Sequence, residues 1–80
     1  MQIAKNVKRL KKVHGLTNTE LANRIGVSRR TVGRLLEAAE TKYTNYYPTE
    51  NTVTNIANFF SVSSHDVRKR LPAFLIDLAI

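Results

Sequence analysis

Apolar residues at helical spacing open the chain. Ile3, Val7 and Leu10 lie at positions i, i+4 and i+7, which is the spacing of one face of an α-helix. A helix over about residues 2–13 is therefore predicted, and Gly15 is expected to end it. The opposite face of this helix carries four basic residues: Lys5, Lys8, Arg9 and Lys12. His14 is expected at the helix end, where a positive charge suits the helix dipole.

Residues 16–37 predict two short helices joined by a tight turn. Thr17 opens an S/T-x-x-E capping box, which marks a helix start. Gly26 lies where a left-handed residue commonly ends a helix. Ser28 is a good N-cap for a second helix over 28–40. Two capped helices separated by a short glycine-containing turn form the helix-turn-helix pattern.

The second of these helices is predicted to be amphipathic. At about 100° per residue, Arg34 falls about 40° from Arg30, and Glu37 about 20° from it on the other side. Gly33 and Arg29 follow further round the helix, whereas the apolar residues cluster on the opposite side: Val32, Leu35, Leu36 and Ala39. The helix is therefore expected to bury one face and to present arginines on the other.

The second half of the chain predicts two more helices. Pro48 and Thr49 mark a start, after which apolar residues again recur at i, i+3, i+4 and i+7: Val53, Ile56, Ala57 and Phe60. Ser63 and Asp66 form a further capping arrangement, so a fifth helix is expected from there to about Leu71. Its basic triplet, residues 68–70, suits the C-terminal end of the helix dipole. Pro72 cannot continue a helix without losing a hydrogen bond.

The tail over residues 71–80 has eight apolar residues in ten. Exposed apolar surface of this kind usually marks an interface, so one interpretation is a two-fold dimer made through Phe74, Leu75 and Leu78. A second is a sixth short helix that folds back on the core. A third is that the tail begins a larger regulator cut at Ile80. The expected organisation is thus a helix-turn-helix domain over 1–71 and a tail over 72–80.

The charge of the chain is unevenly distributed. The formal net charge is +7 over 80 residues. Residues 1–36 hold nine basic residues against Glu20, for a net charge of +8, whereas residues 37–80 hold four against five, for −1. Basic character concentrated on the first three helices is the footprint expected of a surface that meets a polyanion.

Several classes of function are disfavoured. The chain has no cysteine, which excludes thiolate metal sites and disulfides, and its two histidines have no partner at metal-ligand spacing. Isolated histidines, scattered carboxylates and the lack of a phosphate-cradling glycine loop argue against an enzyme, and no cofactor, metal or catalytic residue is expected. The N-terminus lacks the apolar core of a secretory signal, and the apolar tail is about half of a membrane span. A cytoplasmic protein is expected.

The chain resembles a known family over residues 1–71. The run over 16–32 is similar to the DNA-binding segment of Cro-like and lambda-repressor-like (XRE) regulators, and the later positions resemble that family's fourth and fifth helices: Pro48, Thr49, Val53, Ile56, Ala57, Asn58, Val62, Ser63 and Val67. The resemblance implies an all-α, five-helix, lambda-repressor-like domain with an apolar tail. It also implies a transcriptional regulator of the phage or mobile-element repressor type. The chain departs from the family at Asn18, usually Gln, in its longer segment over 38–47, and over 72–80.

The expected partner is double-stranded DNA. The helix over 28–40 is predicted to enter the major groove, which admits one α-helix, with four residues at the base edges: Arg29, Arg30, Gly33 and Arg34. Six residues are predicted to contact phosphate: Asn18 at a helix N-terminus, Ser28, Thr31, Lys12, Lys42 and Tyr43. A homodimer would place its reading helices about 34 Å apart, which predicts an inverted-repeat operator.

Tyr46 and Tyr47 have two possible roles, which are contact with DNA and cover of the core. They are expected to cover the core.

The whole chain could instead be a protein-interaction module, antitoxin-like or anti-activator, that uses the same scaffold through its apolar tail. Affinity that falls steeply with salt would favour DNA, because phosphate contacts release counterions.

Overall fold

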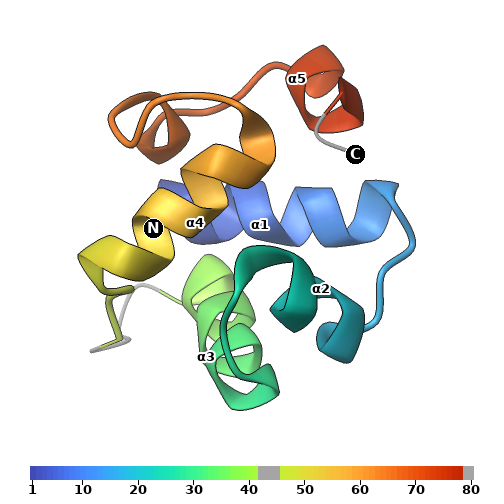
Figure 1. The fold of residues 1–80 in the computed structure, drawn as a ribbon, viewed down its shortest axis with the longest axis vertical. Helices are drawn as coiled ribbons and strands as arrows, with labels where there is room; N and C mark the ends of the chain where they lie inside the picture. Colours follow the sequence, from blue (N-terminus) through green and yellow to red (C-terminus); the bar gives the residue numbers. More distant parts are fainter. Residues whose placement is uncertain (42–45, 79–80) are drawn as a thin grey trace.

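The computed structural model describes residues 1–41 and 46–78, and the side chain of Leu78 lies outside this description (Figure 1). The described residues form five α-helices and one 3-10 helix: α1 (Gln2–Val13), α2 (Asn18–Ile25), α3 (Arg29–Glu40), α4 (Glu50–Phe60), η1 (Asp66–Arg68) and α5 (Ala73–Leu78). The molecule measures 29 × 24 × 22 Å. The predicted all-α class with five helices is confirmed.

Helix α1 is the element around which the others pack. Figure 1 shows it across the middle of the molecule, with α2 and α3 on one side and α5 on the other. Its predicted apolar face is buried, with Val7 and Leu10 fully enclosed. Val13, in the last turn, is 53% exposed and lies outside this face.

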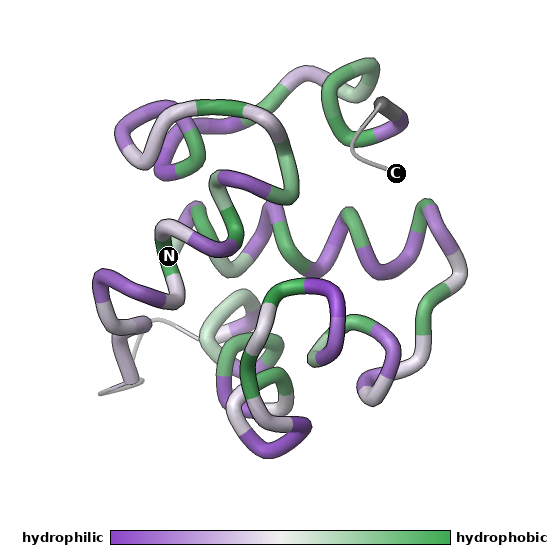
Figure 2. Tube along the Cα trace, viewed as in Figure 1, coloured by the Kyte–Doolittle hydropathy of each residue, from purple (hydrophilic) through white to green (hydrophobic). Residues whose placement is uncertain are grey.

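The remaining helices bury the stripes predicted from their spacing. Figure 2 shows apolar positions recurring along each helix, with hydrophilic residues at the start of α3. The buried apolar residues of α2, α3 and α4 are Leu21, Ala22, Ile25, Val32, Leu35, Ala38, Val53, Ile56, Ala57 and Phe60. Full burial of each large aliphatic side chain contributes about 1.5–3 kcal/mol relative to exposure, and this core holds α3 in a fixed orientation.

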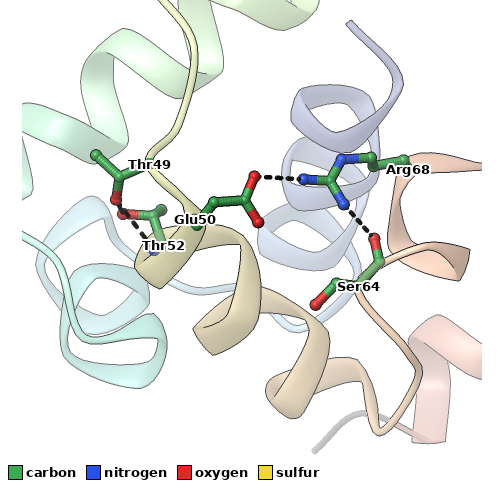
Figure 3. Close-up of polar contacts among 5 residues, drawn as sticks. All are labelled: Thr49, Glu50, Thr52, Ser64 and Arg68. Atoms are coloured by element: carbon green, nitrogen blue, oxygen red, sulfur yellow. Dashed lines mark hydrogen bonds and ion pairs between the residues drawn. The ribbon is translucent and has the colours of Figure 1, made fainter.

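Side-chain caps begin three of the helices, as predicted. Thr17 Oγ1 accepts a hydrogen bond from the Glu20 amide at 3.1 Å, and the Glu20 carboxylate accepts one from the Thr17 amide at 3.0 Å. Thr49 Oγ1 accepts from the Thr52 amide at 3.2 Å at the start of α4 (Figure 3). Each cap satisfies an amide that has no partner within its helix.

The predicted fifth helix from Ser63 to about Leu71 is wrong. Its cap is present, because the Asp66 amide donates to Ser63 Oγ at 3.0 Å. Only the single 3-10 turn of η1 follows, however. Pro72 cannot donate a helical hydrogen bond and disfavours helical conformation in the residue before it. The α1 side chains of Asn6 and Arg9 instead bind carbonyl oxygens in this segment.

Arg68, the last residue of η1, joins this 3-10 turn to α4. Its guanidinium donates to the Ser64 carbonyl oxygen at 2.8 Å and to the Glu50 carboxylate at 3.1 Å (Figure 3). Of the basic triplet predicted at a helix C-terminus, only Arg68 lies at one, the end of the single 3-10 turn, and residues 69–70 lie beyond it. Because this ion pair is exposed, its net contribution to stability is small.

The tail folds back over α1. Leu71 and Ile76 are buried, and α5 packs against both α1 and α4. The His14 ring nitrogen Nε2 donates to the Ile76 carbonyl oxygen at 2.6 Å, since a carbonyl can only accept. Leu75 packs partly against the core, whereas Phe74 is 61% exposed. Dimerisation through Phe74, Leu75 and Leu78 stays a prediction.

Candidate nucleic-acid interface

The turn between α2 and α3 has the expected left-handed glycine. Gly26 has φ 70° and ψ 35°, and the following Val27 amide donates to the Ala22 carbonyl oxygen at 3.0 Å. A Cβ at position 26 would lie 3.1 Å from Nδ2 of Asn55 on α4. The turn is therefore held both by its own hydrogen bonds and by close packing on α4, which sets the direction in which α3 leaves it.

Ser28 caps α3 and also engages Thr31. Its Oγ accepts a hydrogen bond from the Thr31 amide at 3.1 Å, and the two hydroxyl oxygens are 2.9 Å apart. Ser28 is exposed and Thr31 is half-buried. These two residues, both predicted to contact phosphate, are therefore hydrogen-bonded to each other at the start of α3.

The two predicted faces of α3 are present. Val32, Leu35 and Ala38 are fully buried. Arg29, Arg30 and Arg34 are exposed, and none of the three forms an ion pair or hydrogen bond within the part of the chain that the structure describes. Their guanidinium donors are consequently available to a ligand outside the molecule.

Gly33 lies between these arginines without an internal packing role. A Cβ built at this position meets no atom within 4 Å outside its own helix backbone. Its φ is not in the left-handed region, so the fold does not require glycine here. The absence of a side chain leaves the backbone of α3 open to close approach.

Glu37 is an exposed residue on the arginine side of α3 that was not predicted as a site residue. It lies in the third turn of the helix, one turn beyond Arg34. Its helical angle is about 20° from that of Arg30, and this angle was the sequence feature that could have identified Glu37 as a site residue.

A hollow beside this face is lined by Arg34, Glu37, Tyr46 and Tyr47. Tyr46 packs partly against the core, and this burial raises the pKa of its phenol, while the positive charge of Arg34 acts in the opposite direction. Tyr47 is 75% exposed, so the prediction that it covers the core is wrong. Tyr47 lines surface hollows beside α1 and α3 instead of entering the core. The predicted contacts of Lys42 and Tyr43 fall outside the described residues.

Basic residues of α1 border α3 on another side. Lys8, Lys11 and Lys12 line a shallow groove together with Leu36 and Glu40. Lys8 forms an ion pair with Glu40, and its hydrogen bond lowers the pKa of that carboxyl. Lys12, predicted to contact phosphate, is exposed and makes no ion pair among the residues described.

Arg9 departs from its predicted outward orientation. Its guanidinium donates to the Leu71 carbonyl oxygen at 2.7 Å, so it holds the tail rather than a ligand. Asn18 occupies the predicted place at the N-terminus of α2, where it is half-buried. Free amides and the positive end of the helix dipole make this a suitable place for a phosphate.

Residues 1–41 and 46–78 contain neither a cluster of metal ligands nor a membrane-spanning helix. Within these ranges, no three histidine or acidic side chains gather as metal ligands would. In the same residues, no helix has the length and apolar character needed to cross a bilayer.

Comparison with known proteins identifies the family. The family model described as "ECF sigma factor" matches residues 1–48, which is more than half of the chain and includes α1, α2 and α3. Searches of curated proteins and of solved structures returned no significant match.

This match overturns the resemblance to Cro-like and XRE regulators. The features used for that resemblance, such as the capping box, Gly26 and the Ser28 cap, are common wherever capped helices meet at a tight turn. They therefore do not distinguish one helix-turn-helix family from another. The phage-type repressor function inferred from the resemblance loses its support as well. The chain belongs to the ECF sigma factor family and is a DNA-binding, transcription-related protein.

Proposed function

We propose that the chain binds double-stranded DNA with sequence preference by inserting α3 into the major groove. The observation that carries this proposal is the exposed face of α3. Arg29, Arg30 and Arg34 are exposed on a helix that buries Val32, Leu35 and Ala38, and none of the three forms an ion pair or hydrogen bond in the described chain. Rigid support on one side and unpaired donors on the other are what a reading helix requires.

The dimensions and chemistry of α3 fit this role. An α-helix with side chains is about 10–12 Å across, and the major groove of B-DNA is about 12 Å wide. The arginine fork matches the O6 and N7 acceptors of guanine. Gly33 supports the same placement, because the backbone there is open and no internal contact explains the glycine.

Contacts to phosphate would orient the helix. Asn18 at the start of α2 and Lys12 on α1 are the residues that we assign to this task. Ser28 and Thr31 are assigned more weakly, because their hydroxyls already engage one another. Such contacts set the register of the protein on the duplex but do not read sequence.

The test is selection of bound sequences from random duplex DNA at about physiological salt. Enrichment of a sequence containing guanines supports the proposal, and efficient recovery with no enriched sequence contradicts it. The arrangement of the enriched site tests the number of copies bound. An inverted repeat with arms about one helical turn apart would support the predicted homodimer, and one asymmetric site would contradict it.

Further partners and location are part of the proposal. The family suggests RNA polymerase as a protein partner and a cytoplasmic location. The proposed role contains no catalytic step and needs no cofactor.

A second candidate is a protein-interaction module, favoured by one observation. Phe74 on α5 is 61% exposed, which leaves an aromatic side chain on the surface, and aromatic residues commonly anchor protein interfaces. Replacement of Phe74 by serine would abolish binding to a protein partner but would leave binding to short DNA unchanged. Salt separates the two functions, because an apolar interface loses little affinity as salt rises.

A further inference from the structure

Glu37 is an acidic residue on a face that otherwise carries arginines. It is exposed, and its helical angle differs from that of Arg30 by about 20°. Arg34, three residues before it, is at a spacing that commonly forms an ion pair. Within residues 1–41 and 46–78, however, Glu37 forms neither an ion pair nor a hydrogen bond. Its carboxylate is therefore not held by the arginines beside it.

The other three glutamates of the chain each have an intramolecular partner. Glu20 completes the capping box of α2, Glu40 pairs with Lys8, and Glu50 pairs with Arg68. Three of the four glutamates therefore have a partner within the fold. Glu37 has no such contact in the described chain, and its place beside the arginines of α3 puts its carboxylate where the same ligand would bind.

The chemistry of a carboxylate selects among base edges. A carboxylate only accepts hydrogen bonds. In the major groove, cytosine offers the N4 amino donor, whereas guanine offers the acceptors N7 and O6 and thymine the acceptor O4. Adenine has a donor at N6 beside an acceptor at N7. A carboxylate at the base edge therefore favours cytosine and repels guanine and thymine.

We infer that Glu37 determines a cytosine in the DNA site, an inference that rests on the proposed insertion of α3 into the major groove. Seven residues of helix separate Arg30 from Glu37, a rise of about 10 Å, or about three base-pair steps. The cytosine is consequently expected within about three base pairs of the guanine read by Arg30. Glu37 also excludes sites that present an acceptor at this position.

The experiment compares the selected sequences of four proteins: the wild-type chain, Glu37→Gln, Glu37→Ala and Asp77→Asn. The last removes one negative charge from α5, which lies across α1 from α3 (Figure 1). Wild type and Asp77→Asn should enrich the same site, with cytosine preferred about tenfold or more at one position. Glu37→Ala should keep the guanines and lose the cytosine. Glu37→Gln should shift that position towards adenine, since glutamine pairs with N6 and N7.

Two results would overturn the inference while leaving the proposed function in place. One is an unchanged cytosine preference in Glu37→Ala. The other is an equal gain in affinity for every sequence, which would show that Glu37 only repels phosphate. Failure of the wild-type chain to enrich any sequence would instead refute the proposed function, and this inference with it. Circular dichroism of each variant verifies that the helices are intact, which the exposure of Glu37 leads us to expect.

Discussion

The side-chain amide of Asn6 donates a hydrogen bond of 2.7 Å to the main-chain carbonyl oxygen of Val67, 61 positions later in the chain. The same nitrogen donates to the Lys69 carbonyl oxygen at 2.8 Å, and Gln2 donates to the Asn6 side-chain oxygen at 3.2 Å. Asn6 is fully buried. A polar residue inside the core thus donates the hydrogen bonds to these carbonyl oxygens, which lie in the segment where a longer helix after Ser63 was predicted.

Replacement of Asn6 by aspartate should destabilise the fold by about 2–6 kcal/mol. The substitution keeps the shape but places an acceptor against two carbonyl acceptors, each of which costs about 1–3 kcal/mol when left unsatisfied. Urea unfolding followed by circular dichroism measures the change. Gln2→Ala, which removes only the half-buried donor to Asn6, is the control and should cost less. Equal stability of Asn6→Asp and wild type would show that the contact with Val67 contributes nothing.

Replacement of Gly33 by alanine should raise stability and lower DNA affinity together. Alanine is favoured over glycine in a helix by about 1 kcal/mol, and the added methyl group has open space in the free protein. Close approach of DNA to this backbone would be obstructed. Thermal unfolding and DNA titration of one preparation measure both effects. Gly15→Ala also has open space but φ +61°, so it should lose stability. Unchanged affinity in Gly33→Ala would remove Gly33 from the interface.

Substitutions of Ser28 should separate its capping role from DNA binding. Asparagine and aspartate are both good N-caps, so either should preserve the stability of α3. Aspartate, however, adds a negative charge where phosphate is expected. We predict that Ser28→Asp binds DNA at least tenfold more weakly than Ser28→Asn, an energy of about 1.4 kcal/mol. Similar affinities for the two variants would place Ser28 away from the phosphates. Ser28→Ala should lose about 1 kcal/mol of stability.

Arg30→Ala and Lys12→Ala should weaken DNA binding in different ways. Loss of a base contact at Arg30 should cost about 1–3 kcal/mol on the preferred site and relax the preference at one base pair. Loss of a phosphate contact at Lys12 should weaken all sequences alike and reduce the salt slope by about one. Titrations of specific and random duplexes at several salt concentrations distinguish them. An equal loss on both duplexes for Arg30→Ala would refute base reading by this residue.

Stability should fall in acid partly through Glu40 and Glu20. The hydrogen bond and charge of Lys8 lower the pKa of Glu40, and hydrogen bonds with Thr17 lower that of Glu20, from an ordinary value of 4.5. Because the folded pKa lies below the unfolded one, the stabilisation is present above about pH 4.5 and is lost as pH falls through the lowered values.

Thermal unfolding over this pH range provides the measurement. Glu40→Gln should make the decline in acid shallower, because it removes the group whose protonation breaks the contact with Lys8. High salt should reduce the difference between this variant and wild type by screening the exposed pair. An identical pH profile in Glu40→Gln would show that the pair does not contribute to stability.

The arginine face illustrates how far the candidate site could be predicted. The exposure of Arg29, Arg30 and Arg34 follows from their angles relative to the buried Val32 and Leu35, and the structure confirms it. The partners of neighbouring residues do not follow from angles. Lys8 is paired, Arg9 is turned to the tail and Tyr47 is exposed, because each depends on which distant segment lies beside it.

The helix-turn-helix motif alone did not identify the family. The helix-turn-helix over residues 16–37 has a local geometry that unrelated regulators share. Caps, a left-handed glycine and small packing residues recur wherever two short helices meet at a tight turn. The family-model match, which extends over residues 1–48 and not over the motif alone, replaced the Cro-like interpretation.

The sequence by itself determined the helices α1 to α4, their caps and the side of α3 that carries arginine. These features depend on hydrogen bonds and side-chain spacing within a few residues, so local sequence contains the information. Only the tertiary structure decided the course of residues 63–78. Asn6, Arg9 and His14 of the first helical segment bind carbonyl oxygens there, and Pro72 interrupts the local alternative. Partners about 60 residues apart leave no periodic signal, because their pairing is set by how the helices pack.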